Sequence, residues 1–174
     1  MFGRRRKSEL EHFQRNAAGE LVYTGALYSF QGPGARKGQL GRLWALGGAA
    51  FLLILAAGLT PAPGQRGYWY VTLPYAGALV LAMAALWSLG RISLAGDPIR
   101  QYVYEGSCQK FSPLFWCAGL LSGAAGLGQI AYLLLHGGGD RLLPGIAYAL
   151  MLLAGGAAGC LSGKRSGALR WEKQ

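Results

Sequence analysis

Four long apolar runs without a single charged side chain limit what this chain can fold into. They cover residues 43–60, 70–89, 114–135 and 144–163, and none of them contains Lys, Arg, Asp, Glu or His. A helix that rises 1.5 Å per residue needs about 20 apolar residues to cross roughly 30 Å of hydrocarbon. Each run therefore predicts one transmembrane helix. Together they predict an all-α membrane protein whose four helices form two hairpins.

The composition favours a bilayer over a soluble core. Hydrophobic residues make up 52% of the chain and charged residues only 14%, whereas soluble domains carry about 25% charged residues. A soluble fold would have to hide four apolar helices behind very little polar surface. We therefore divide the chain into a basic N-terminal segment with a linker (1–42), a membrane domain (43–163) and a basic tail (164–174).

The distribution of positive charge predicts the orientation of the spans. Fifteen of the 17 basic residues lie in residues 1–42, 91–110 and 164–174, and only Arg66 and Arg141 lie elsewhere. Threading four spans puts those three segments on one side, which the positive-inside rule makes cytoplasmic. We expect both termini inside a bacterial plasma (inner) membrane, with residues 4–7 held at the inner face. These cations are expected to meet anionic lipid headgroups rather than nucleic acid, because no nucleic-acid module accompanies them.

Two similar segments precede the two halves of the membrane domain. Residues 22–25 read Val-Tyr-Thr-Gly and residues 103–106 read Val-Tyr-Glu-Gly. Both read as short strands, the first as one arm of a hairpin across a turn at 16–19. This weak repeat suggests a parallel duplication with a pseudo-twofold axis along the membrane normal, or else a coincidence between two independent loops. We expect the segments to meet beneath the bundle, by strand pairing or tyrosine packing, as a cytoplasmic platform with Tyr23, Gly25, Tyr104 and Gly106 as its candidate residues.

Small residues recur at helical spacing in the third and fourth runs. In lipid, such residues let helix backbones approach closely, which is the main source of helix association there. We expect these two runs to pack on each other, or one of them to pair with a second copy in a homodimer. Gln129 is the most polar side chain deep in any run, so we expect an interhelical hydrogen bond, with a substrate contact as the alternative. The helix-packing candidates are Gly119, Ser122, Gly123, Gly126, Gln129, Gly155, Gly156 and Gly159.

The sequence offers little for catalysis. His12 and His136 fall on opposite sides of the predicted bilayer, and Cys108, Cys117 and Cys160 form no C-x-x-C pair. No phosphate-binding glycine loop, nucleophile elbow or paired carboxylates are recognisable. We therefore expect no enzyme, cofactor or metal site. The favoured function is an accessory, scaffold or regulatory subunit of a larger membrane complex. The alternative is a small-solute transporter or channel that works as a homo-oligomer.

Overall fold

Four long apolar helices form the body of the protein. The computed structural model describes residues 13–15, 20–32, 36–65, 67–137 and 139–174. Each of the four helices is long and apolar enough to cross a membrane, so the prediction of four such helices is confirmed. They are α2 (Arg36–Leu59), α3 (Trp69–Leu94), α5 (Gln109–His136) and α6 (Leu142–Gly167).

The helices extend beyond the predicted runs. Helix α2 begins at Arg36 rather than at Leu43. Residues 36–42, which we expected to belong to the linker, are therefore helical. The first residues of the basic tail are also helical, since α6 continues to Gly167. The basic residues of these extensions lie outside the charge-free run of each helix.

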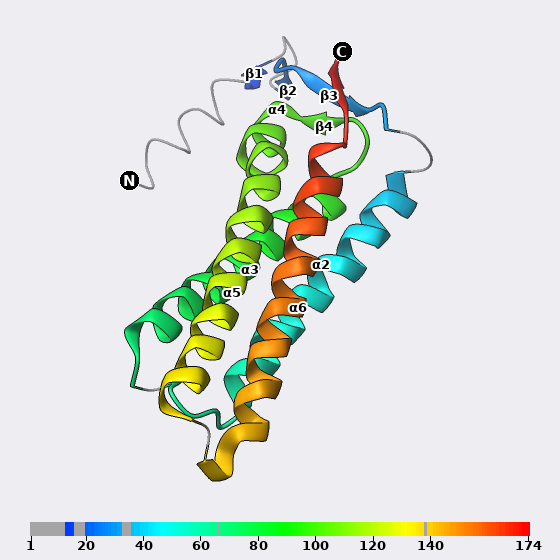
Figure 1. The fold of residues 1–174 in the computed structure, drawn as a ribbon. Coiled ribbons are helices and arrows are strands. Elements are labelled where there is room, and N and C mark those ends of the chain that lie inside the picture. Colours follow the sequence, from blue (N-terminus) through cyan, green and yellow to red (C-terminus); the bar gives the residue numbers. More distant parts are fainter. Residues whose placement is uncertain (1–12, 16–19, 33–35, 66, 138) are drawn as a thin grey trace.

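The helices pack around a shared axis, with α5 against both α6 and α3, and α2 against α6. The contact between α2 and α3 is less extensive, although these helices follow each other in sequence. Figure 1 shows the bundle with small strands and the C-terminus at one end, which we call the sheet end. The opposite end, called the loop end, carries the connections 60–68 and 137–141, which include the short helix η2 (Gly139–Arg141).

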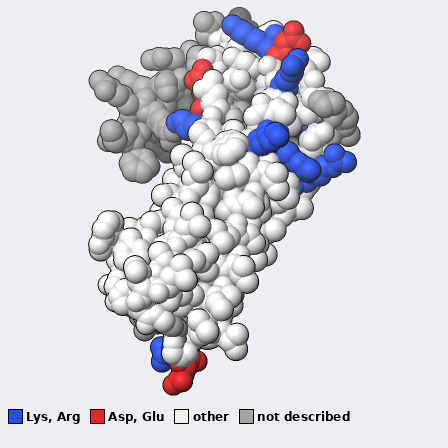
Figure 2. Space-filling view, viewed as in Figure 1, with Lys and Arg blue, Asp and Glu red and all other residues white. Residues whose placement is uncertain are grey.

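The core consists of small, branched and aromatic side chains between the helices. One cluster, toward the loop end, includes the fully buried Ile54, Val71 and Tyr148. A second, toward the sheet end, includes Phe111 and Phe115. The outward faces are also apolar, and the face in Figure 2 shows charges only near its two ends.

Short strands lie at the sheet end. Strands β1 (Phe13–Arg15) and β2 (Leu21–Tyr23) pair antiparallel, which is the short β structure expected in the N-terminal segment. The predicted turn at 16–19, the basic cluster at 4–7 and His12 lie outside the described residues. A separate antiparallel sheet has the order β4-β3-β5, built from β3 (Leu27–Phe30), β4 (Ile99–Arg100) and β5 (Trp171–Lys173).

The expected strand at residues 103–106 is wrong. The chain instead forms α4 (Gln101–Val103) and one π-helical turn, η1 (Tyr104–Cys108), which lead directly into α5. Val103, Ser107 and Phe111 are all buried, and their spacing of four residues is that of a helix face. Burial of this face against α3 outweighs the local strand preference. The two repeat segments thus differ in structure, which removes the main support for a duplication.

Candidate functional site

The sheet end joins three segments that are far apart in sequence. Tyr28 of β3 lies opposite Ile99 of β4 on one side and Lys173 of β5 on the other. Backbone hydrogen bonds extend the pairing, from Gln101 N to Ala26 O at 3.0 Å and from Gln174 N to Leu27 O at 2.9 Å. The N-terminal segment thereby ties the α3–α4 connection to the C-terminus.

Strand β5 has one edge that pairs with no other described strand. The bonds from Gln31 N to Arg170 O and from Gln174 N to Leu27 O show which residues of β5 face β3. Backbone groups alternate sides along an antiparallel strand, so Arg170, Glu172 and Gln174 face β3. The N–H and C=O groups of Trp171 and Lys173 therefore point to the outer edge. An edge of this kind is a template for another strand.

Tyr23 and Tyr104 both lie at the sheet end, and the structure shows contacts of each with other residues. The Tyr23 hydroxyl accepts a hydrogen bond from Gln101 N at 3.0 Å, and the Arg100 guanidinium lies 5.4 Å from the centre of its ring. Tyr104 instead stacks on Tyr28, with ring centroids 4.1 Å apart. The N-terminal segment therefore does contact the chain between α3 and α5. The contacts join Tyr23 to Gln101 and Tyr28 to Tyr104.

The two platform glycines have different surroundings, and neither lies in a strand. A Cβ on Gly25 would collide with the ring of Tyr23. Gly106 lies in the π-helical turn, where a Cβ would be 3.7 Å from Arg91 Nη1. Gly25 thus makes room for the ring of Tyr23, whereas a Cβ at Gly106 would be in ordinary van der Waals contact with Arg91.

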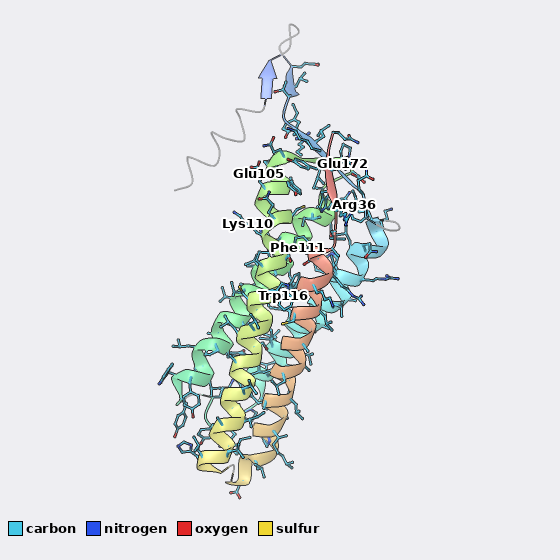
Figure 3. The ribbon with its side chains drawn as sticks, turned by 45° about the horizontal axis from the view of Figure 1, so that its top comes forward. Arg36, Glu105, Lys110, Phe111, Trp116 and Glu172 are labelled. Carbon is cyan, nitrogen blue, oxygen red and sulfur yellow. The ribbon has the colours of Figure 1, made fainter. Side chains whose placement is uncertain are left out.

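Arg36 connects three elements at this end and was not singled out from the sequence. Its Nη2 donates hydrogen bonds to Ile92 O at 2.7 Å and Ala95 O at 2.6 Å, which are carbonyls at the end of α3. Its guanidinium also lies 5.8 Å from the ring centre of Trp171 in β5. A cation at a helix C-terminus satisfies unpaired carbonyls and complements the helix dipole. Figure 3 shows Arg36 on the side of α2 and β5, and Glu105 and Lys110 on the side of α4 and α5.

Helices α5 and α6 meet through glycines, in a contact that we call the α5–α6 seam. A Cβ on Gly156 would lie 2.8 Å from Gly119 O, and a Cβ on Gly159 would lie 3.0 Å from Gly119 Cα. Gly126 also belongs to the seam, since its Cβ would be 3.2 Å from Ala149 O. Backbone atoms cannot yield as a flexible side chain does, so these positions have no room for larger residues.

Other packing candidates play different parts. Ser122 Oγ donates a hydrogen bond to Leu152 O of α6 at 2.7 Å. Gly155 faces α2, where a Cβ would be 3.1 Å from Ile54 Cγ1. Gly123 contributes its backbone to the seam, but a Cβ on it would have no neighbour within 4 Å. The expectation that a side chain at Gly123 would push the helices apart must therefore be revised.

Gln129 is fully buried and bonds to a connection rather than to a helix. Its Nε2 donates a hydrogen bond to Pro63 O at 2.8 Å. Its Oε1 has no hydrogen-bond partner among the described residues. The side chain thus fixes the α2–α3 connection onto α5 at the loop end.

The loop end also holds an aromatic cluster beside a cavity of about 340 Å³. The ring of Tyr68 lies 4.8 Å from that of Tyr132 and 5.0 Å from that of His136. Residues 58–65, Gly67, Tyr68 and Arg141 line the cavity. Because Tyr68 packs against rings of the protein itself, the cluster is a structural tie between the α2–α3 connection and α5.

No metal-binding arrangement stands out in the part of the chain that the structure describes. There, no three side chains of His, Cys, Asp or Glu gather closely enough to hold an ion. Cys108, Cys117 and Cys160 are free thiols. Comparisons with known protein families, with curated proteins and with solved structures find no match for this chain.

Proposed function

We propose that this protein is a four-span integral membrane protein with its sheet end in the cytoplasm, and that it acts as an accessory or scaffold subunit of a membrane complex. The large apolar side chains on the outward faces of the bundle support membrane insertion, since a water-soluble bundle carries polar residues there. The basic residues at the sheet end support the orientation.

The observation that carries the scaffold role is the three-stranded sheet, whose β5 edge pairs with no other strand in the part of the chain that the structure describes. Three segments that are far apart in sequence form this sheet. Arg36 connects it to the helices, since its guanidinium contacts both β5 and the end of α3. Main-chain groups on an exposed edge bind a partner by adding a strand, with side chains beside the edge giving specificity. The proposed partner therefore contributes a β-strand that pairs with Trp171 and Lys173.

The filled core argues against transport through a single copy. Four of the five buried serines bond to helix carbonyls rather than to one another, so these four form no polar path; they are Ser88, Ser122, Ser162 and Ser166. A solute pathway would require separation of the helices or space between copies. Solute flux into proteoliposomes by the purified protein would favour the transport alternative.

Orientation can be tested with single cysteines on a background that lacks the three native ones. Asp140 and Glu172 are both exposed and lie at opposite ends of the bundle. We expect Asp140→Cys to react with an impermeant thiol reagent added to intact cells, and Glu172→Cys to react only after the membrane is opened. The reverse pattern would refute the orientation.

The partner can be tested with proline substitutions along β5. Lys173→Pro removes an N–H that points to the free edge, whereas Glu172→Pro removes one that faces β3. The chain is tagged and crosslinked to its neighbours in its native membrane. We expect Lys173→Pro to retain the fold but to lose the crosslinked partner protein. Lys173→Ala, which removes only the charge, should retain that protein. Equal crosslinking by Lys173→Pro and Lys173→Ala would refute docking at this edge.

A further inference from the structure

A groove of about 350 Å³ opens between α2 and α3 in the half of the bundle nearest the sheet. Its walls are almost entirely apolar, and Trp87 and Leu94 on its rim are 74% and 90% exposed. It exists because α2 and α3 are in limited contact and because Gly90 leaves its floor without a side chain. The lining residues are Trp44, Phe51, Met83, Leu86, Trp87, Gly90, Arg91 and Leu94.

The groove has the depth of one bilayer leaflet. Met83 and Leu94 mark its extent along α3, and the eleven steps between them in the sequence correspond to about 16 Å of helix. Half of the hydrocarbon core is about 15 Å thick. An acyl chain lying along α3 would therefore fit the groove from the headgroup region to the middle of the membrane.

Arg91 is the single charged residue that lines the groove. It is half-buried, and no hydrogen bond or ion pair joins its side chain to another described residue. One nitrogen, Nη1, lies beside Gly106 in the π-helical turn, so the guanidinium is near the sheet end of α3, beside the groove. The five N–H donors of a guanidinium match the oxygens of a phosphate group.

Arg91 has no evident task within the chain itself. A cation in the last turn of α3 is expected to satisfy helix carbonyls, but Arg36 already donates to Ile92 O and Ala95 O there. Trp44 lies at the same end of the groove, where its single indole N–H is donated to Ser93 Oγ at 2.9 Å. A positive charge that has no partner among the described residues, beside an apolar groove, complements a negatively charged amphiphile.

We propose that the α2–α3 groove binds one anionic phospholipid of the cytoplasmic leaflet, with an acyl chain along α3 and the phosphate on Arg91. Gly90 admits the chain, and the ring of Trp44 flanks it near headgroup depth, where tryptophan is favoured. The inference rests on the proposed membrane insertion and orientation, but not on the scaffold role.

Native mass spectrometry of the full-length protein in detergent tests this site. The purified protein is titrated with phosphatidylglycerol and, separately, with phosphatidylcholine of the same acyl chains. We expect one phosphatidylglycerol to bind in preference to phosphatidylcholine. Arg91→Gln should weaken its binding about tenfold, the loss expected for a charge-assisted hydrogen bond, while Arg91→Lys should weaken it less.

Two further variants separate the groove from general charge. Gly90→Leu places a side chain in the groove without meeting backbone, since its Cβ contacts only Trp44 Cζ2 at 3.9 Å. It should reduce binding of the lipid although it leaves Arg91 in place. Lys110→Gln removes an exposed cation of α5 at the same end and should leave binding unchanged.

Equal affinity for the two lipids would overturn the proposal, as would unchanged binding in either Arg91→Gln or Gly90→Leu. Because the lipid is counted on the purified chain, the result is independent of any protein partner. Intact lipid binding with no β5-dependent crosslink would refute the scaffold role alone. A β5-dependent crosslink together with a loss of selective lipid binding would refute the lipid site alone.

Discussion

The α5–α6 seam makes a sharp prediction about two glycines that look equivalent in the sequence. A Cβ on Gly156 would lie 2.8 Å from Gly119 O and 3.0 Å from Gly123 N, whereas a Cβ on Gly123 would meet no atom within 4 Å. A comfortable C···O separation is at least about 3.3 Å, so Gly156→Ala must move the two backbones apart by about 0.5 Å. Gly123→Ala requires no movement.

The expected difference in stability follows from two contributions. Replacing glycine by alanine within a helix gains up to about 1 kcal/mol in helix propensity at both positions. Overpacking against rigid backbone costs about 1–3 kcal/mol, and only Gly156→Ala incurs this cost. We therefore expect the free energy of unfolding of Gly156→Ala to lie about 2 kcal/mol below that of Gly123→Ala.

Reversible unfolding in mixed micelles, titrated with a denaturing detergent, measures this difference. Ala49→Leu on the exposed face of α2 serves as a control for a larger apolar side chain that faces away from the core. If Gly156→Ala and Gly123→Ala differ by less than about 0.5 kcal/mol, the seam is not closely packed at Gly156 and the reasoning fails.

The same unfolding assay tests three other contacts. Arg36→Met should cost about 2 kcal/mol because the carbonyls at the end of α3 lose a charged donor, while loss of the exposed neighbouring charge in Lys37→Met should cost little; equal costs would contradict the bridging role. Gln129→Leu should cost about 1 kcal/mol or less, since it removes both a hydrogen bond and a buried oxygen without a described partner, and a loss above about 3 kcal/mol would be incompatible with this account. A double-mutant cycle with Tyr28→Leu and Tyr104→Leu should give a coupling of about 1 kcal/mol, and zero coupling would show that the stacked rings do not interact.

The sequence alone was sufficient to predict the four helices, because the length and apolar character of a helix are local properties of the chain. Each helix contains a charge-free run whose length is set by the rise of a helix, whatever the rest of the chain does. The small residues of α5 and α6 likewise indicated where backbones approach. They did not distinguish Gly123 from Gly156, because the direction of a side chain across a helix pair depends on the rotation of both helices.

The sheet end was much less accessible to sequence reasoning. Strand β4 has two residues and β5 has three, too few to show an alternating pattern. The pairing of β3 with β5 joins residues separated by about 140 positions, and it forms because the helix bundle brings those positions to the same end. Residues 103–106 had a strand-like composition, yet they became helical where burial against α3 favoured it.

What the sequence by itself determined is therefore the number, length and apolar character of the helices, together with the concentration of basic residues near one end. The tertiary structure decided which side chains meet there. Arg36 lies on the end of α3, Tyr104 stacks on Tyr28, and Arg91 lines a groove with no described partner. The removal of an apolar run from water depends on that segment alone, whereas hydrogen bonds and ring contacts need two groups within a few ångströms. That proximity exists only after the four helices have packed.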